Sequence, residues 1–291
     1  MKKLCTLIVN PTSGKYSEPG IHQVVRTLSA HGLAPQLFIT RTAEEGPDIA
    51  AALCQEGGNP LIVVGGGDGT INGVANGLIP GTATLAVLPL GTANVLAKEL
   101  GIGSVDDAVA RIIRGETRQL AAGVVTRDGE ERRFLLMTGV GFDARVVQRT
   151  RSVEKKILKQ GAYLLAGVRC LWSWERELLQ VTIDGRETVA CHSVVVCNAA
   201  KYGGSFRLAP EADLSTSGFQ VVCVTEPTRL AVAGLAAATI MGVAKPASGI
   251  RRFSATRLAI AGSKPVQIDG DHWGDSPVCI ETVGNLAKII C

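Results

Sequence analysis

The sequence lacks an apolar stretch long enough to span a bilayer. The longest such stretch, residues 230–244, contains 15 residues, whereas a transmembrane helix needs ~20. The apolar run near the N-terminus stops at Val9 and has no cleavage site, so it favours a first strand over a signal peptide. We therefore expect a cytoplasmic protein.

The sequence also lacks the cysteine and histidine patterns of metal sites and disulfide frameworks. No Cys-x-x-Cys pair occurs, and no histidine stands at a metal-ligand interval. The eight cysteines lie among apolar runs, at Cys5, Cys54, Cys170, Cys191, Cys197, Cys223, Cys279 and Cys291. We expect them to be buried, reduced thiols rather than disulfides.

A large excess of charge of either sign is missing as well. The chain has 30 Lys and Arg against 26 Asp and Glu, and its net charge of +4 is too small to indicate nucleic-acid binding. It permits a mild preference for anionic ligands or membrane surfaces. With 46% hydrophobic residues over 291 positions, the chain is globular and long enough for two domains.

In residues 1–121, short apolar runs alternate with helical patterns. Strands are predicted at 4–9, 36–39, 61–64 and 84–88, and helices at 21–30, 49–54, 71–78, 93–100 and 106–114. This alternation is typical of right-handed βαβ units, which form a parallel, Rossmann-like sheet with ligand sites at the carboxyl ends of its strands. The sequence therefore predicts an α/β domain over residues 1–121.

From about residue 117, strands joined by polar turns replace this alternation. The predicted strands are 119–125, 132–137, 178–183, 189–197, 219–224, 258–260, 266–268 and 278–283, and two of the turns contain Asp-Gly. Helical pieces at 156–171 and 229–242 interrupt them. The pattern predicts a β-rich sandwich over residues 122–291 and leaves open that the last few residues return to the first domain.

The functional prediction starts from residues 61–72. Four apolar, mostly β-branched residues are typical of a strand buried on both faces, and glycines 65–67 follow at once. Apolar residues then recur at helical spacing from Ile71, so the glycines lie in a strand-to-helix turn, where free N–H groups and the helix dipole attract phosphate. Four glycines in five positions around Asp68 favour a phosphate site over a tight turn in which glycine only supplies a positive φ.

Two further polar turns follow predicted strands. Residues 10–15 contain a Gly-Lys pair, but Val9 replaces the leading glycine of a P-loop and Tyr16 its hydroxyl residue, which excludes a Walker A loop. Taken alone, this turn is equally compatible with a plain connection, and Thr92 in the third turn, residues 88–94, with a simple N-cap. Because parallel strands end at one edge of a sheet, we expect the three turns to converge on one site.

Seven motifs occur in a fixed order along the chain. They are Asn10-Pro-Thr-Ser-Gly14, Gly66-Gly-Asp-Gly-Thr-Ile-Asn72, Pro89-Leu-Gly-Thr-Ala-Asn94, Gly139-Val-Gly-Phe-Asp-Ala144, Asn198-Ala-Ala-Lys-Tyr-Gly-Gly204, Ala209-Pro210 and Ile268-Asp-Gly-Asp271. Together they resemble the catalytic domain of the diacylglycerol kinase and sphingosine kinase superfamily, particularly its bacterial lipid kinases. The resemblance covers nearly the whole chain and implies an α/β domain of the NAD kinase and diacylglycerol kinase type, followed by a β-sandwich.

The resemblance implies that ATP binds between the two domains, with its phosphates at residues 66–72. The nucleotide-contacting residues that it implies are Asn10, Ser13, Gly14, Thr42, Gly66, Gly67, Asp68, Gly69, Thr70, Ile71, Asn72 and Thr92. Phosphoryl transfer needs positioned phosphates, Mg²⁺ to offset their charge, and a carboxylate that accepts the proton of the attacking hydroxyl. Asp68 is the candidate for holding that Mg²⁺ through water.

The proton acceptor in the resembling kinases is usually the glutamate of an Asp-Gly-Glu motif. Here the motif ends in Asp271, which keeps the carboxylate but is one methylene shorter. Its reach differs by roughly 1.5 Å, and a misplacement of about 1 Å can cost ~10²-fold in rate. A plain Asp-Gly hairpin turn explains the residues equally well when they are taken alone; with the resemblance we favour Asp271 as the base.

Two other positions depart from the family pattern. Val95 stands where the family commonly has an aspartate that can assist metal or acceptor binding. Residues 215–218, Ser-Thr-Ser-Gly, stand where an Asp-Asp-Gly turn commonly holds a structural Mg²⁺. We expect that metal site to be absent or weakened, with Asp213 as the only nearby carboxylate.

A basic segment suggests how a lipid could be reached. It contains Arg145, Arg149, Arg151, Lys155, Lys156 and Lys159, beside apolar residues and followed by Trp172 and Trp174. Such a segment suits an anionic membrane surface, although a solvated charged face with core tryptophans explains it equally well. Residues 230–244 are compatible with a core helix or with one wall of an acyl-chain pocket, and we favour the core helix.

The sequence therefore predicts an ATP- and Mg²⁺-dependent kinase that phosphorylates a lipid hydroxyl, such as that of diacylglycerol or a sphingoid lipid, in the cytoplasm or at the inner face of the membrane. A soluble NAD-kinase-like or sugar-phosphate kinase is one alternative, although the turn at residues 89–94 and the Asp-Gly-Asp motif argue against it. A nucleotide- or lipid-binding regulator that has lost catalysis is another, suggested by Val95, Ser217 and Asp271. The sequence leaves the lipid open, and also whether the chain forms a homodimer.

Overall fold

The computed structural model describes residues 3–150, 177–204, 206–226, 228–241 and 248–291. The chain divides into two compact units, Met1–Ala121 with Val283–Cys291 (unit 1) and Ala122–Thr282 (unit 2). Strands β5 (Thr117–Arg127) and β18 (Val278–Ile290) contribute residues to both units.

Unit 1 is built on a parallel sheet with the strand order β2-β1-β3-β4. Its strands are β1 (Lys3–Val9), β2 (Leu33–Ile39), β3 (Leu61–Gly66) and β4 (Thr84–Pro89). The end of β18 pairs in parallel with β4. Every residue of β3 and β4 is buried, as expected for apolar strands that are covered on both faces.

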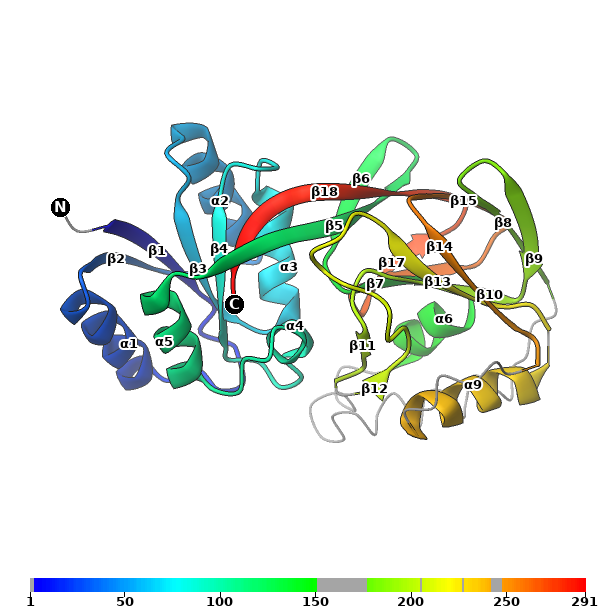
Figure 1. Ribbon diagram of the computed structural model, residues 1–291, viewed down its shortest axis with the longest axis horizontal. Helices are drawn as coiled ribbons and strands as arrows, with labels where there is room; N and C mark the ends of the chain where they lie inside the picture. The colour runs from blue at the N-terminus through cyan, green and yellow to red at the C-terminus, as the bar shows by residue number, and fades with distance from the viewer. Residues whose placement is uncertain (1–2, 151–176, 205, 227, 242–247) are drawn as a thin grey trace. The chain divides into compact units, whose positions relative to one another are not determined.

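Five helices cover this sheet. They are α1 (Glu18–Ala30), α2 (Glu45–Glu56), α3 (Asp68–Gly77), α4 (Val95–Glu99) and α5 (Val105–Arg114). α1 packs beside α5 on one face and α2 beside α3 on the other (Figure 1). α1 buries Ile21, Val24 and Leu28, which share one stripe of the helix. The predicted α/β fold with a parallel sheet is confirmed.

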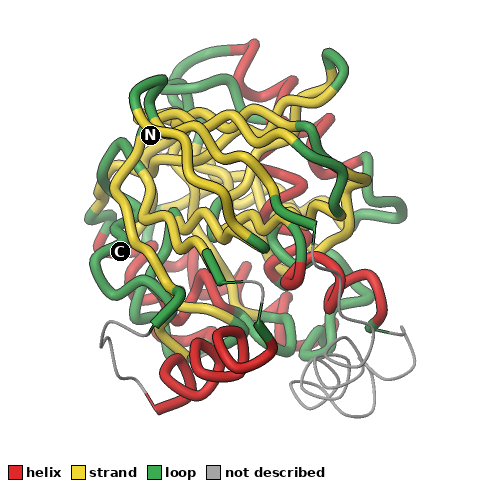
Figure 2. Tube along the Cα trace, turned by 90° about the vertical axis from the view of Figure 1, so that its right-hand side faces the viewer, coloured by secondary structure: helices red, strands yellow, loops and turns green. Residues whose placement is uncertain are grey.

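Strands make up most of unit 2 (Figure 2), and they pair in antiparallel fashion. One sheet has the order β14-β13-β10-β7-β16-β17. These strands are β7 (Met137–Val140), β10 (Ser193–Cys197), β13 (Phe219–Val224), β14 (Ile250–Ala255), β16 (Pro265–Ile268) and β17 (Asp271–Asp275). The other layer contains the start of β18, the hairpin of β5 with β6 (Glu130–Phe134), and β15 (Arg257–Ala261), β8 (Leu179–Ile183) and β9 (Glu187–Cys191).

An apolar core lies between the two layers of unit 2. It takes side chains from both, for example Leu179 and Ile280 from one and Val194 and Val266 from the other. The Phe134 and Phe219 rings stack with centroids 5.5 Å apart. The predicted β-sandwich is therefore confirmed. The remaining described elements of unit 2 are α6 (Phe142–Arg149), α9 (Arg229–Met241), β11 (Lys201–Tyr202) and β12 (Phe206–Arg207).

Asp-Gly turns close three hairpins of unit 2. In each, the aspartate has a φ between 46° and 51° and the glycine a φ between 68° and 89°, at residues 128–129, 184–185 and 269–270. Two consecutive left-handed residues are what a tight hairpin turn requires, and Asp-Gly supplies them with little strain. These turns therefore form from their local sequence.

Two predicted strands are each divided in the structure. The run 132–137 is interrupted after Phe134, because the N–H groups of residues 135–137 bond to the Asp269 carboxylate. The run 189–197 is interrupted at His192, where the chain passes from β9 in one sheet to β10 in the other. The sequence pattern of residues 189–197 does not reveal such a crossing, and β14, β17 and α6 were not predicted at all.

The described cysteines are free thiols. Burial raises the pKa of Cys5 to about 11 and that of Cys197 to about 12, which keeps both thiols protonated. The expectation of burial is wrong for Cys279, which is exposed on β18 because alternate side chains of that strand face solvent.

Several predicted features fall outside the described residues. They are Cys170, the helix at 156–171, the tryptophans 172 and 174, and the basic residues 151, 155, 156 and 159. Within the described part of the chain, no helix combines the length and the apolar character needed to cross a membrane.

Candidate functional site

Three turns meet at the carboxyl edge of the parallel sheet in unit 1. They are residues 10–15 after β1, 66–70 after β3 and 89–94 after β4, and we term them the three-turn cluster. The chain goes from β1 to β2 on one side and then returns past β1 to β3, so β1 and β3 flank the point where the strand order reverses. Ligands of open α/β sheets bind at this switch point.

The glycine turn ends in an uncapped helix N-terminus. The first helical bond of α3 runs from Ile71 N to Gly67 O (3.1 Å), so the N–H groups of residues 68–70 precede the hydrogen-bonded turns. No side chain caps this end of α3. A Cβ built on Gly69 would meet nothing within 4 Å. The turn therefore presents several N–H groups and the positive end of the α3 dipole to an anion.

The glycines of this turn have different roles. None of them has a positive φ, so the interpretation in which glycine only supplies that conformation is wrong. A Cβ on Gly66 would lie 2.5 Å from Thr70 Cβ, and one on Gly67 would lie 3.3 Å from Gly91 Cα. Gly66 and Gly67 thus allow close packing within the cluster, whereas Gly69 leaves the helix end open.

Asn10 links the first turn to the glycine turn across the switch point. Its Nδ2 donates to Thr70 Oγ1 (3.0 Å), and its Oδ1 accepts from Thr12 N (2.9 Å). Ser13 and Gly14 continue the same turn, in which Ser13 N donates to Asn10 O (3.2 Å). A Cβ on Gly14 would lie 3.3 Å from the Thr92 hydroxyl, so the first turn also touches the third.

The third turn is bonded to the other two. Leu90 N and Gly91 N both donate to Gly66 O (3.1 Å each), and Lys15 N donates to Leu90 O (2.8 Å). Thr92 itself is exposed and is not the N-cap of α4, because Asn94 occupies that position in a left-handed conformation. The interpretation of Thr92 as a simple N-cap is therefore wrong.

Asp68 satisfies the first N–H groups of α4. Its Oδ2 accepts from Val95 N and its Oδ1 from Leu96 N, each at 3.0 Å. The predicted metal-holding carboxylate thus also ties the glycine turn to the helix after the third turn. Each oxygen keeps a second lone pair for another donor or for a water.

The other predicted nucleotide residues of unit 1 lie near the cluster with less direct contact. The side chain of Ile71 is buried in the core, and that of Asn72 is buried and accepts from Asn76 Nδ2 (3.0 Å). Thr42 is exposed beyond β2, on the same edge of the sheet. A backbone N–H bond, and then a bond from the Thr42 side chain, lower the pKa of Glu44.

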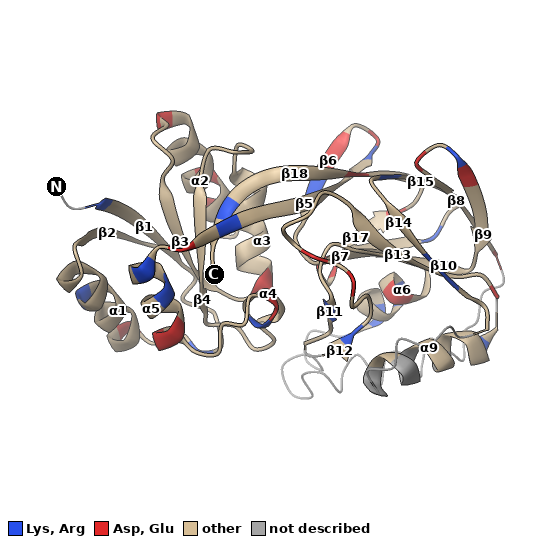
Figure 3. Cartoon of the chain, viewed as in Figure 1, with Lys and Arg blue, Asp and Glu red and all other residues tan. Residues whose placement is uncertain are grey.

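Asp271, the predicted base, opens β17 in unit 2. Its side chain is 58% exposed, and its Oδ2 lies 3.6 Å from Arg132 Nη2 on β6, which carries charges of both signs (Figure 3). The preceding Asp269 carboxylate accepts from Leu135 N (2.8 Å), Leu136 N (3.0 Å) and Met137 N (2.9 Å). The hairpin turn predicted as a plain alternative is therefore real, and it presents an accessible carboxylate.

Two family models cover most of the chain. The diacylglycerol kinase catalytic domain matches residues 5–125, and the YegS C-terminal NAD kinase beta sandwich-like domain matches residues 137–291, more than half of the chain. The chain belongs to the diacylglycerol kinase catalytic superfamily. Within it, this chain is a kinase of the bacterial lipid kinase type.

Individual relatives agree with this assignment. A protein named "Diacylglycerol kinase" from Bacillus subtilis is 29% identical over 94% of this chain and 92% of its own length. The "Probable lipid kinase YegS-like" of Chromohalobacter salexigens is 27% identical over 77% of this chain and 72% of its own. The crystal structure of a candidate diacylglycerol kinase from Bacillus anthracis superposes with a TM-score of 0.81 at 22% identity, covering 99% of this chain and 97% of that one, which shows the same fold.

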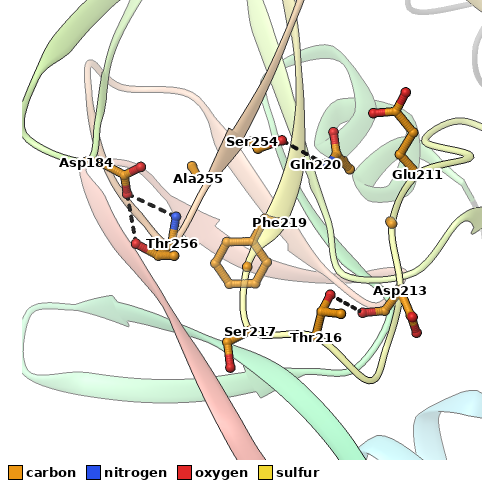
Figure 4. Close-up of a pocket in the computed structure, with 12 residues that line it drawn as sticks. Asp184, Glu211, Asp213, Thr216, Ser217, Phe219, Gln220, Ser254, Ala255 and Thr256 are labelled. Atoms are coloured by element: carbon orange, nitrogen blue, oxygen red, sulfur yellow. Dashed lines mark hydrogen bonds between the residues drawn. The ribbon is translucent and has the colours of Figure 1, made fainter.

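In this kinase, the turn at residues 213–218 lacks the Asp-Asp-Gly sequence expected of a structural Mg²⁺ site. It borders a pocket of about 250 Å³, which Asp184 and Glu211 also line (Figure 4). Asp213 Oδ1 accepts from Ser215 N (2.9 Å), and Asp184 Oδ1 accepts from Thr256 and Arg257 N–H groups (2.9 Å each). Among the described residues, no three His, Cys, Asp or Glu side chains gather as metal ligands. The turn does not fit a Mg²⁺ held by carboxylates.

A catalytic Mg²⁺ makes smaller demands on the protein. Mg²⁺ keeps several waters and is usually bound by one or two carboxylates together with substrate phosphates. The lone pairs that Asp68 retains beside the open helix end fit such an ion.

Sequence reasoning assigned no role to several polar residues that the structure brings together. Asp143, Gln267 and Tyr202 form one hydrogen-bonded group in unit 2. Asp143 and Tyr202 lie in the motifs at residues 139–144 and 198–204, so a signal was present. Gln267 lies outside these motifs and gave no signal. It bonds to Gly270, three residues further along, but also to Asp143, which is 124 residues away in the sequence.

Proposed function

We propose that the protein transfers the γ-phosphate of ATP to the hydroxyl of a membrane lipid, with diacylglycerol as the first acceptor to test. The uncapped α3 N-terminus, held by three cross-bonded turns at the switch point of the sheet, is the observation that carries this proposal. Such a turn binds the phosphates of a nucleotide through backbone N–H groups. The family assignment supports a lipid as the class of acceptor.

In this proposal the nucleotide contacts are those of the three-turn cluster and Thr42. The N–H groups at residues 68–70 bind the phosphates, and Asn10, Ser13, Gly14 and Thr92 border them. Mg²⁺, when bound, offsets the charge that develops on the transferred phosphoryl group. Asp68 would hold it through water while it keeps its bonds to α4.

Asp271 is the proposed general base. Its carboxylate accepts the hydroxyl proton of the lipid while the hydroxyl oxygen forms a bond to the γ-phosphorus. The bond from that phosphorus to the β–γ bridging oxygen breaks, and ADP leaves. Because the acceptor lies in a membrane, the protein would act as a peripheral protein at the cytoplasmic face.

The test is ADP release with diacylglycerol, a sphingoid base or ceramide in mixed micelles. Asp271→Ala should lower kcat by about 10² to 10⁴-fold, the usual contribution of a general base. Asp275→Ala is the matched control, because Asp275 is an exposed aspartate at the other end of the same strand. It should keep the parent rate.

Three results would contradict the proposal. Activity on NAD or a sugar phosphate without detergent, with none on lipids, would make the protein a soluble kinase. ATP binding by calorimetry without turnover on any acceptor would make it a regulator. If Asp271→Ala kept the kcat of the parent, Asp271 would not be the base.

A further inference from the structure

A buried hydrogen-bond chain lies behind the turn that precedes Asp271. Gln267 on β16 is 2% exposed, and its side-chain amide is used at both ends. Its Oε1 accepts from Gly270 N (2.8 Å), and its Nε2 donates to Asp143 Oδ2 (2.8 Å). The backbone next to Asp271 is therefore bonded to a buried carboxyl group on another element.

The chain extends from β16 to α6 and β11. Asp143 on α6 is buried, and its Oδ1 accepts from the Tyr202 hydroxyl on β11. Gly139 on β7 makes room for these side chains, because a Cβ there would overlap Asp143 Oδ2 and lie 3.1 Å from Gln267 Nε2. Burial raises the pKa of the Asp143 carboxyl, and the bonds from Tyr202 and Gln267 oppose that rise.

The Asp-Gly turn does not need this chain in order to form. The turn at residues 128–129 has similar left-handed φ values, although its aspartate side chain is 90% exposed. Burying a carboxyl group is unfavourable even when it is hydrogen-bonded. The turn at 269–270 is nevertheless bonded to this chain through Gly270 N, and it precedes Asp271, the proposed base.

We propose that Gln267 and Asp143 are positioning residues that fix the Gly270 backbone, and with it Asp271, while Tyr202 connects this support to the ribbon of β11 and β12. The inference rests on the proposed role of Asp271 as the base. The first residue of the turn, Asp269, is held by its own carboxylate, which accepts from three backbone N–H groups. The second, Gly270, is held by the bond from its N–H group to Gln267. Both residues before the base are then held by hydrogen bonds, one of them to the buried Gln267 side chain.

Loss of this support should lower kcat and leave nucleotide affinity unchanged. A displacement of about 1 Å at a reacting group can cost ~10²-fold in rate. We therefore expect Gln267→Leu, which has a similar size but no polar atoms, to lower kcat by about 10 to 100-fold. The KM for ATP should stay within about twofold, because the proposed nucleotide contacts lie in unit 1.

A polarity swap provides the rescue. In the double variant Gln267→Glu with Asp143→Asn, the glutamate can accept from both Gly270 N and the new Asn amide, whose oxygen can accept from Tyr202. All three bonds are then possible with the same net charge, so kcat should recover to within a few fold of the parent. The Gly270 amide hydrogen should exchange faster in Gln267→Leu than in the parent, and its exchange rate should return to that of the parent in the double variant.

The matched control is Ser276→Ala at the open end of the same hairpin. Ser276 is 5% exposed, and its hydroxyl bonds to Gly262 O and Lys264 N at 3.0 Å each. This variant should lower the thermal midpoint without lowering kcat. If Gln267→Leu does not fold, Tyr202→Phe replaces it, with a several-fold loss of kcat expected.

The outcomes separate this inference from the proposed function. The inference is overturned if Asp271→Ala is inactive while Gln267→Leu, or Tyr202→Phe in its place, keeps kcat within twofold of the parent. It is also overturned if Ser276→Ala loses kcat to the same extent, or if the double variant recovers none. If Asp271→Ala itself keeps the parent kcat, the base assignment fails, and the positioning role fails with it.

Discussion

Replacing Gly69 by alanine should separate phosphate binding from folding. A Cβ at this position meets nothing within 4 Å, and Gly69 has no positive φ, so the folded chain accommodates the methyl group. Side chains of a helix tilt toward its N-terminus. The new methyl group would therefore point to the place where a phosphate would approach the free N–H groups of α3.

The size of the effect on ATP affinity depends on how many hydrogen bonds between the α3 N–H groups and the phosphates are lost. A hydrogen bond to a charged group contributes about 1.5–3 kcal/mol net, and each 1.4 kcal/mol changes an equilibrium constant tenfold. Loss of one such bond should raise the Kd for ATP by about 10 to 150-fold. Folding should be unaffected or slightly favoured, because alanine is better than glycine in a helix by up to about 1 kcal/mol.

Calorimetric titration with ATP and thermal unfolding measure the two effects. Two glycine variants in the same region serve as controls. Gly73→Ala, in the open middle of α3, should raise stability by about 0.5–1 kcal/mol and leave the Kd unchanged. Gly66→Ala should destabilise the fold by about 1–3 kcal/mol, since its Cβ would lie 2.5 Å from Thr70 Cβ. A parent Kd in Gly69→Ala would refute the phosphate site at this turn.

Three further predictions concern the carboxylates. Asp68→Ala should lower the free energy of unfolding by about 1–2 kcal/mol, because the first N–H groups of α4 lose their acceptor, and Asp68→Asn by about half as much, because asparagine keeps one acceptor oxygen. Equal stability of the two variants in urea would contradict this. Asp269→Ala should cost about 3 kcal/mol or more by leaving three buried N–H groups unpaired, whereas Asp269→Asn, which keeps one acceptor and tolerates the left-handed conformation, should cost less in the same assay. Burial raises the pKa of Asp143, so the folded protein binds the Asp143 proton more tightly than the unfolded chain, and the contribution of Asp143 to stability decreases as pH rises above about 4. The free energy of unfolding of the parent minus that of Asp143→Asn, measured in urea at successive pH values, should therefore decrease over that range. A constant difference would exclude the effect.

The elements of unit 1 were largely predictable from local pattern. Continuous apolar runs such as β3 and β4 and the helical stripe of α1 each occupy a contiguous stretch, so their signal is local. The Asp-Gly hairpins were predictable for the same reason. The crossing at His192 was not, because only the pairing partners of β9 and β10 assign these two strands to different sheets.

The sequence by itself determined where polar and glycine-rich turns follow buried strands, and hence that a phosphate site is expected after β3. Only the tertiary structure decided which glycine is open and which two are packed, because Thr70 and Gly91 are the neighbours that fill the space at Gly66 and Gly67. It also decided that Asp68 caps a helix 27 residues further along and that Gln267 joins Asp143 across 124 residues. Such bonds depend on how the chain folds back on itself. The residues around a side chain in the sequence do not indicate which distant group it will contact.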